Sequence, residues 1–345
     1  MNGSDGAQPL DPVTELLITQ AGDVHGPVGV LDDAGGGLTA ALLEAGRVVR
    51  TWCDDLRDEL AVEPSARAAT PAEAVTGSTT VLFRLPKSLT ALDEYAGVIA
   101  RHADPAVRVL AGAREKHLNR SMNRVLARHF EHVSASRGAR KARALRADEP
   151  IPTAEGWPRL RRLDGVDLTV AAHGATFNTN RLDHGTALLA YLFDQLPVAD
   201  RAIDLGCGSG ILAALLARQG RRVSAVDVTW SGTSAARLTA QANDLHIDVQ
   251  RRDGLAGWSE PVALIVTNPP FHVGVAKDTS PTRALFGQAA QALCGDGEMW
   301  CVYNAHLPYL PWLNEAIGPT SIVARDRGYV VTRSVRRPGG AITHR

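Results

Sequence analysis

The sequence predicts an α/β protein that consists of two tandem Rossmann-like domains, each built on a mostly parallel, doubly wound sheet. Two observations predict this fold class. Short apolar segments alternate with helical segments along the chain, which is typical of parallel strands joined by crossover helices. The same alternation occurs twice along the chain. A length of 345 residues is consistent with two domains, because one domain takes roughly 150 residues.

The second half carries the clearer copy of this pattern. The apolar segment 201–205 is followed by a glycine loop and a helix over 211–219, and Ser231 is the expected N-cap of the next helix. A further helix is expected around 281–293, before a turn at 295–297. The expected strands lie at 201–205, 221–228, 247–253, 262–271, 299–304, 321–326 and 329–335, and the last two form an antiparallel pair.

The first half repeats the pattern more faintly. Residues 26–46 have the order strand, glycine loop and helix, and further strands are expected within 47–55, 79–88 and 106–115. We interpret this as an internal duplication with a degenerate first copy. The boundary is expected in 147–158, which holds three prolines and one glycine. The predicted organisation is a tail over 1–20, a degenerate domain over 21–150 and a second, functional domain over 151–345.

Composition excludes several classes of protein. Hydrophobic residues make up 45% and charged residues 21% of the chain, so the chain as a whole is not disordered. It has no run of 18 apolar residues and no apparent secretory signal, so we expect neither a membrane span nor export. The four cysteines form no C-x-x-C pair and the histidines have no metal-ligand spacing, so we expect no metal and a reducing cytoplasm.

Charge is distributed unevenly, although the formal net charge is zero. Residues 1–63 hold 12 acidic and 3 basic side chains, whereas residues 101–146 hold 12 basic and 3 acidic ones. A smaller basic cluster lies at 159–162. Such clusters bind phosphates by releasing counterions, but they also occur as solvated surface, and spacing alone does not separate the two. The candidate nucleic-acid-binding residues are Arg137, Arg140, Lys141, Arg143 and Arg146.

A glycine-rich loop connects the first strand of the second half to its helix. Gly206, Gly208 and Gly210 lie in this loop. Glycines let the backbone pass close to a ligand, and a helix N-terminus offers unpaired N–H groups. The third glycine comes one residue too early for the dinucleotide pattern G-x-G-x-x-G. The loop taken alone also fits a tight turn that binds nothing.

Three acidic residues lie at the carboxyl ends of neighbouring strands. Asp204 precedes the loop, and Asp227 ends the second strand, where an acid accepts hydrogen bonds from ribose hydroxyls in doubly wound folds. Asp253 ends the third strand, close to where an adenine would lie. Taken singly, Asp227 could be a helix cap and Asp253 a loop acid. Together with the glycines, the acids predict one binding crevice.

The segment Asn268-Pro269-Pro270-Phe271 ends the fourth strand, because two prolines cannot continue a sheet ladder. An exocyclic amino group of a nucleobase is a poor nucleophile, since its lone pair is delocalised into the ring. We assign its two N–H bonds to the Asn268 side-chain oxygen and the Pro269 carbonyl, which would orient the lone pair for attack. Phe271 would stack on the base. A turn with a core phenylalanine is the alternative interpretation.

These motifs resemble those of class I S-adenosylmethionine-dependent methyltransferases. GATFNTNRLDHGTALLAYL (174–192) resembles the segment before the first strand in the ribosomal RNA guanine-N2 methyltransferases of the "small" methyltransferase family. TNPPFHVG, YNAHLPYLPWL (303–313) and, in the first half, FRLPKS resemble further motifs of that family. The resemblance covers most of residues 21–337. The pair Thr229-Trp230 is unusual for the family and is expected to alter the adenine pocket.

The resemblance implies a seven-stranded catalytic domain, a first domain that binds RNA and supports the second, and S-adenosyl-L-methionine as the cofactor. Asn268 to Phe271 would hold the target guanine, with Asn268 also beside the cofactor. Phe177, Asp183 and Gly185 would border the methionine end of the cofactor. Asp227 would hold the ribose and Asp253 the adenine amino group. The residues expected to line the cofactor along the loop are Asp204, Gly206, Cys207, Gly208 and Gly210.

The resemblance further implies methyl transfer to the N2 amino group of a guanine in ribosomal RNA, with the small subunit favoured over the large. The expected partner is therefore ribosomal RNA or a ribosomal subunit, and a monomer is favoured. A second interpretation keeps the chemistry but changes the substrate to adenine N6 or a protein glutamine amide. A third is a non-catalytic RNA-binding assembly factor that has kept the fold.

Overall fold

A computed structural model describes residues 10–177, 181–269 and 280–337 of the chain. The chain divides into two compact units, unit 1 (Met1–Trp157) and unit 2 (Pro158–Arg345), and each is described by itself. The division falls within the proline-containing segment 147–158. Among the described residues, no helix is both long enough and apolar enough to cross a membrane.

Unit 1 is built on a six-stranded sheet with the order β2-β1-β3-β4-β6-β5. The first four of these strands are parallel, and β6 and β5 are antiparallel. The strands are β1 (Val28–Leu31), β2 (Val49–Trp52), β3 (Thr80–Arg84), β4 (Arg108–Arg114), β5 (Phe130–Ala135) and β6 (Ala142–Pro150). The helices are α1 (Pro12–Ala21), α2 (Gly37–Glu44), α3 (Leu56–Ala61), α4 (Pro71–Val75), α5 (Leu89–His102) and α6 (Arg120–Leu126), with short 3₁₀ turns η1 (Ala34–Gly36), η2 (Pro64–Ala66) and η3 (Glu115–His117).

Residues 12–21 are a helix and not part of the tail expected over 1–20. Asp11 caps α1 by accepting from the Val13 N–H at 2.9 Å, and Pro12 occupies the first helical position. Val13, Leu16 and Leu17 are buried in the core of unit 1 against strand residues. The apolar face of this helix therefore belongs to the fold, because its burial covers one face of the sheet.

Unit 2 is built on a seven-stranded sheet with the order β11-β10-β9-β12-β13-β15-β14, preceded by a separate hairpin. Only β15 and β14 run antiparallel to their neighbours, as the sequence predicts. The sheet strands are β9 (Arg201–Leu205), β10 (Arg222–Asp227), β11 (Ile247–Arg251), β12 (Val262–Thr267), β13 (Leu293–Asn304), β14 (Thr320–Arg325) and β15 (Tyr329–Val335). The hairpin strands are β7 (Arg159–Leu163) and β8 (Leu168–Ala172), which are not among the strands expected from the sequence.

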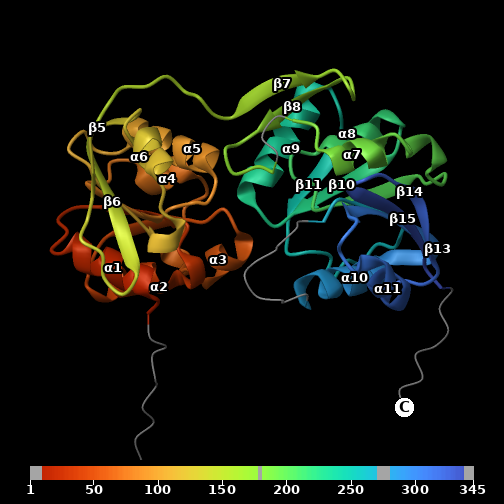
Figure 1. Ribbon diagram of the computed structural model, residues 1–345, viewed down its shortest axis with the longest axis horizontal. Coiled ribbons are helices and arrows are strands. Elements are labelled where there is room, and N and C mark those ends of the chain that lie inside the picture. Colours follow the sequence, from red (N-terminus) through yellow and green to blue (C-terminus); the bar gives the residue numbers. More distant parts are fainter. Residues whose placement is uncertain (1–9, 178–180, 270–279, 338–345) are drawn as a thin grey trace, which may run out of the picture. The chain divides into compact units, whose positions relative to one another are not determined.

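Helices cover both faces of the unit 2 sheet (Figure 1). One hydrophobic cluster joins α7, α8 and α9 to the sheet, and a second joins α10 and α11 to its other face. This is the doubly wound arrangement that alternating strands and helices predict. The helices are α7 (His184–Ala190), α8 (Ile211–Arg218), α9 (Trp230–Ala242), α10 (Ser280–Ala292) and α11 (Tyr309–Ala316), with a 3₁₀ turn η4 (Phe193–Gln195).

The strand orders confirm the predicted duplication. Strands β2-β1-β3-β4-β6-β5 of unit 1 follow the same order as β10-β9-β12-β13-β15-β14 of unit 2, which adds only β11 at one edge. Helix α1 contacts β4 and β6, and α7 contacts the corresponding strands β13 and β15. Helix α1 is therefore the unit 1 counterpart of α7.

Two local predictions in unit 2 are wrong. Thr229, and not Ser231, is the N-cap of α9, because the Thr229 hydroxyl accepts from the Gly232 N–H at 3.1 Å. Residues 295–297, expected as a turn before the fifth strand, are part of β13. Asp296 in this segment has a φ of 61°, and the pairing of β12 with β13 shifts register at this end. The strand is therefore irregular at the position of Gly295 and Gly297.

Candidate active site

The glycine loop joins the end of β9 to the start of α8. Gly206, Gly208 and Gly210 have φ angles of 72°, 49° and 77°, in the left-handed region that other residues rarely adopt. The N–H groups of Gly206 and Cys207 both donate to the carbonyl of Val226 in β10, at 2.8 and 3.0 Å. The loop therefore needs glycine for its path and is tied to the neighbouring strand through its backbone.

Two of these glycines have different surroundings. A Cβ atom at Gly210 would lie 2.9 Å from the Cβ of Ala236, so this glycine lets α8 and α9 pack closely. A Cβ atom at Gly208 would meet nothing within 4 Å. Gly208 is thus the point at which the loop backbone faces open space, which suits a ligand that approaches the main chain.

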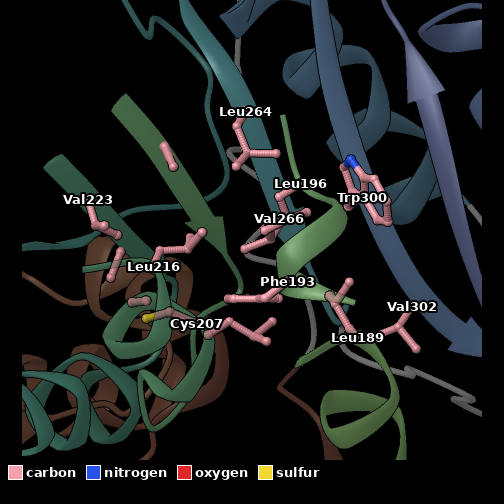
Figure 2. Packing of buried hydrophobic residues seen from close by; sticks show 14 of the residues in the cluster. Leu189, Phe193, Leu196, Cys207, Leu216, Val223, Leu264, Val266, Trp300 and Val302 are labelled. Carbon is pink, nitrogen blue, oxygen red and sulfur yellow. The ribbon is translucent and has the colours of Figure 1, made fainter. Parts of the chain in front are cut away.

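The side chain of Cys207 belongs to the hydrophobic core. It is 8% exposed and packs in a cluster with Leu216, Val266 and Trp300, as Figure 2 shows. Burial, and after it the nearby Asp227 carboxylate, raises the pKa of this thiol well above its ordinary value. The backbone of Cys207 is therefore part of the loop, and its side chain is part of the core.

Asp204 lies in β9, two residues before Gly206. Its side chain is 1% exposed, and Oδ2 accepts from the Ala213 N–H at 2.9 Å. Its Oδ1 atom is buried without a hydrogen-bond partner among the described residues. Burial raises the pKa of this carboxyl to about 7. Asp204 thus fixes the first turns of α8 from inside the unit.

Asp227 holds the loop from the adjacent strand, β10. Its Oδ2 accepts from the Gly208 N–H at 2.9 Å, and its Oδ1 accepts from the Thr229 N–H and hydroxyl at 2.8 and 2.7 Å. The ring of Trp230 packs on that of His173, with centroids 4.8 Å apart. The unusual Thr229-Trp230 pair therefore has a structural role, since Thr229 orients the Asp227 carboxylate and Trp230 packs the first turn of α9 against His173.

The other predicted cofactor residues at this end of the sheet are Asp253 and Phe177. Asp253 is exposed two residues after β11, and the N–H of its neighbour Arg252 donates to the Asp227 carbonyl at 2.9 Å. This bond brings the ends of β10 and β11 together, as the sequence predicts for strands that share an edge. Phe177 is 60% exposed.

Asn268 connects the end of β12 to the first turn of α7. Its Nδ2 donates to Asp183 Oδ2 and to the Thr186 hydroxyl, both at 3.0 Å. Asp183 is also the N-cap of α7, accepting from the Thr186 N–H at 3.1 Å. The Asn268 Oδ1 atom is buried and has no hydrogen-bond partner among the described residues. Pro269 is buried, and Pro270 and Phe271 lie outside the described residues.

Tyr329, at the start of β15, completes this cluster. Its hydroxyl donates to Asp183 Oδ1 at 3.2 Å, and its ring lies so close to Gly185 that a Cβ atom there would be 2.8 Å from it. Burial raises the pKa of the Tyr329 hydroxyl, and the Asp183 carboxylate adds to the effect. Gly185 therefore makes room for the Tyr329 ring.

Sequence reasoning missed two members of this cluster. Thr186 stands within the segment 174–192 that carries the family resemblance, so that segment contained a signal for it. Tyr329 lies 146 residues from Asp183 in the chain and in no motif, so only the structure brings the two together.

The corresponding loop of unit 1 has the same length but different residues, and its second left-handed residue is Gly35 and not the counterpart of Gly208. Asp32 takes the position of Gly206, with a φ of 54°, and Ala34 takes that of Gly208. A Cβ atom at Gly36, the counterpart of Gly210, would lie 2.3 Å from the Ala61 carbonyl oxygen. Residue Ala61 of α3 therefore lies directly against this loop, and a side chain replaces each of the first two glycines.

The candidate RNA-binding residues fall into two groups. Arg140 pairs with Glu15, Arg143 pairs with Glu115 at 3.4 Å, and Arg146 donates to Gln20. Arg137 and Lys141 are exposed, and no carboxylate of the described ranges lies within ion-pair distance of either. The stretch is thus partly neutralised, because β6 and the turn before it bring these arginines beside acidic and polar side chains of α1 and η3.

Comparisons with known proteins agree with the motifs. A family described as "Methyltransferase small domain" matches residues 167–333, and one described as "RLMG N-terminal domain" matches residues 4–150. The chain is 30% identical over 368 residues to ribosomal RNA large subunit methyltransferase G of Streptomyces avermitilis, covering 95% of this chain and 96% of the relative. It is 34% identical over 267 residues to the methyltransferase G of Stutzerimonas stutzeri, covering 74% of this chain and 70% of the relative.

Small-subunit relatives are also similar. The chain is 37% identical over 195 residues to ribosomal RNA small subunit methyltransferase C of Pseudomonas fluorescens, but this match spans only 56% of the chain and 55% of the relative. A solved structure of a T. thermophilus 16S rRNA N2 methyltransferase, in complex with AdoMet and guanosine, shares the fold with a TM-score of 0.79 and 22% identity, covering 97% of this chain and 94% of that one. The chain therefore belongs to the ribosomal RNA guanine-N2 methyltransferase family, as an RLMG N-terminal domain followed by a methyltransferase small domain.

Proposed function

We propose that this protein transfers a methyl group from S-adenosyl-L-methionine to the N2 amino group of a guanine in ribosomal RNA. The observation that carries the proposal is the orientation of the Asn268 amide. Its Nδ2 atom is engaged by Asp183 and Thr186, so the buried, unpartnered Oδ1 atom is the end available to a substrate. A lone acceptor selects a hydrogen-bond donor, and an exocyclic amine is such a donor.

The residues of the glycine loop fit the cofactor. Its backbone is open at Gly208, where unit 1 has an alanine, Asp227 ends the neighbouring strand β10, and Asp253 follows β11, the next strand of the sheet. Gly206, Gly208 and Gly210 would line the cofactor, Asp227 would accept from its ribose and Asp253 from its adenine amino group. Phe177, Asp183 and Gly185 would border its methionine end. When bound, the cofactor supplies a methyl group activated on a sulfonium.

The protein's own contribution to the reaction is orientation. Asn268 Oδ1 and the Pro269 carbonyl would accept the two N–H bonds of the amine, so that the nitrogen lone pair points toward the donor. Phe271 would stack on the base. No strong base is required, because the amine becomes acidic only as the new bond forms. The guanine has to be unstacked to reach this site, which costs a few kcal/mol in a duplex.

Unit 1 would contribute binding of the RNA backbone. Its exposed cations Arg137 and Lys141 have no carboxylate partner among the described residues, so each is available to a phosphate. Arg140, Arg143 and Arg146 would bind RNA only in competition with the partners they already have. The cytoplasm is the proposed location, since ribosomal RNA is the proposed substrate.

The sequence favours the small ribosomal subunit, whereas two observations favour the large one. An RLMG N-terminal domain matches residues 4–150, and a large-subunit relative aligns over 95% of this chain. Primer extension on 16S and 23S RNA from a deletion strain separates the two, because the one unmethylated guanine identifies the subunit.

The proposal is tested by tritiated methyl transfer to ribosomal RNA from the deletion strain. We expect the product, digested to nucleosides, to contain N2-methylguanosine, and Asn268→Ala to lower turnover by about 10²–10³-fold. N6-methyladenosine or a methylated glutamine would establish the alternative substrates. Absence of S-adenosylmethionine binding in calorimetry would favour a non-catalytic assembly factor instead.

A further inference from the structure

The two units can be compared residue by residue at the end of the strand that carries Asn268. In unit 2, Leu205 of β9 pairs with Thr267 of β12, and Asn268 follows. In unit 1, Leu31 of β1 pairs with Phe83 of β3, and Arg84 follows. Because the sheets have corresponding strand orders, Arg84 stands at the position of Asn268.

Arg84 makes the same connection as Asn268 does. Its guanidinium donates to Asp11, the N-cap of α1, and to the Thr14 hydroxyl at 3.0 Å. Helix α1 is the counterpart of α7, and Asp11 and Thr14 have the spacing of Asp183 and Thr186. Each unit therefore has a clasp, by which we mean a side chain at the strand end that donates to an aspartate N-cap and to the threonine three residues later.

The two clasps differ in whether the donating side chain keeps an unused hydrogen-bond acceptor. A guanidinium has donors only, whereas an amide that donates through nitrogen keeps an oxygen acceptor. The clasp itself thus serves the fold in both units, and the spare acceptor exists only in unit 2, at Asn268 Oδ1. The duplication therefore separates two roles of Asn268: Nδ2 makes the clasp that both units have, and Oδ1 is the atom left for a substrate.

A second difference concerns the aspartate. The pairing of β13 with β15 places Tyr329 at a position that Ala142 holds in unit 1, and alanine has no hydroxyl to offer Asp11. In unit 2 the Tyr329 hydroxyl donates to the Asp183 oxygen that Asn268 does not use. Tyr329 therefore fixes the rotation of the carboxylate to which the Asn268 amide is bound.

We propose that Tyr329 is a positioning residue for the methyl transfer: through Asp183 it holds the Asn268 amide so that Oδ1 faces the substrate amine. This proposal rests on the proposed function and adds a residue that acts on Asn268 through Asp183. The absence of a hydroxyl at the corresponding place in unit 1 supports the proposal, since the clasp there forms without one. Tyr329 is thus needed for the orientation of the acceptor and not for the clasp.

The test compares three variants by their kcat, their KM for S-adenosylmethionine and their Tm. Tyr329→Phe should lower kcat about 10- to 100-fold, because small displacements of a reacting group have effects of this size, with KM and Tm close to those of the wild type. Asn268→Arg, which copies Arg84, should abolish transfer but keep Tm, whereas Asn268→Ala should lower turnover by about 10²–10³-fold and lower Tm as well. Tyr191→Phe, on the exposed end of α7, is the matched control for removal of a hydroxyl.

A kcat of Tyr329→Phe within twofold of the wild type overturns the proposal, and so does a loss of kcat that follows a loss of Tm. Equal Tm values for Asn268→Arg and Asn268→Ala would overturn the clasp. If the wild-type protein itself transfers no methyl group to ribosomal RNA, the proposed function fails, while the comparison of Tm values still decides on the clasp.

Discussion

The N–H group of Gly208 donates to the Asp227 carboxylate at 2.9 Å, so the glycine loop and the end of β10 are joined by a side chain as well as by the sheet. Asp227 receives two further hydrogen bonds from Thr229. An aspartate held in this way is pre-oriented before any ligand arrives, which lowers the entropic cost of binding. The loop and the acid proposed to hold the ribose therefore act as one element.

The glycines of the loop give the first prediction. Gly208→Ala should weaken S-adenosylmethionine binding at least tenfold while lowering the free energy of unfolding by only about 1–2 kcal/mol, the cost of a left-handed alanine. Gly210→Ala should destabilise the fold more, because its Cβ would lie 2.9 Å from that of Ala236. Calorimetry with the cofactor and thermal unfolding measure the two effects.

The matched control is Gly257→Ala. Gly257 has a φ of 69° and nothing within 4 Å of an added Cβ, so it carries the same backbone strain at a place that the loop does not reach. Cofactor affinity should be unchanged in this variant. Equal affinities for Gly208→Ala and Gly257→Ala would show that the loop does not line the cofactor.

Cys207 gives the second prediction. Because its side chain lies in the core, Cys207→Ala should lower the free energy of unfolding by about 1 kcal/mol and leave cofactor affinity unchanged. The raised pKa of its buried thiol should also make it react slowly with iodoacetamide in the folded protein. A fall in affinity without a fall in stability would place the side chain at the cofactor instead.

Much of the fold follows from the sequence, because strand order depends on patterns that are local. The alternation of strands and helices, the antiparallel β14 and β15 and the duplication could all be predicted. The direction of the Cys207 side chain could not, because it depends on the φ angles of its glycine neighbours. The partners of Arg140 and Tyr329 could not either, since they lie 125 and 146 residues away in the chain.

Asp204 gives the third prediction, on the pH dependence of stability. Burial raises the pKa of its carboxyl to about 7 in the folded state, from 3.8. The folded protein therefore binds more protons than the unfolded chain between these values, and this group makes the free energy of unfolding fall as pH rises from about 4 to above 7. Over the whole of this pH range the free energy of unfolding falls by about 4 kcal/mol, because one pKa unit corresponds to about 1.4 kcal/mol.

Asp204→Asn should remove this fall, because an amide oxygen can accept from the Ala213 N–H as the carboxylate does. The variant should be more stable than the wild type at pH 8, and the difference should vanish near pH 4. Denaturant unfolding at a series of pH values measures it, with the exposed Glu315→Gln as control. A constant difference across the series would contradict the raised pKa.

The basic stretch of unit 1 gives the last prediction. A cation that already has a carboxylate partner neutralises that partner and releases fewer counterions from RNA than an unpaired one does. Replacing Arg137 and Lys141 by glutamine should therefore weaken RNA binding and reduce the slope of log K against log salt by about 0.7–0.9 for each phosphate that is no longer neutralised. The same replacements at Arg140 and Arg143, which pair with Glu15 and Glu115, should change the slope less.

The measurement is the affinity for a ribosomal RNA fragment by fluorescence anisotropy, at a series of salt concentrations. Both double variants remove two positive charges, so a general effect of net charge would change their slopes equally. A larger change for Arg137 and Lys141 would show that individual phosphate interactions determine the binding. If neither variant changes the slope, the stretch is solvated surface and unit 1 binds RNA elsewhere or not at all.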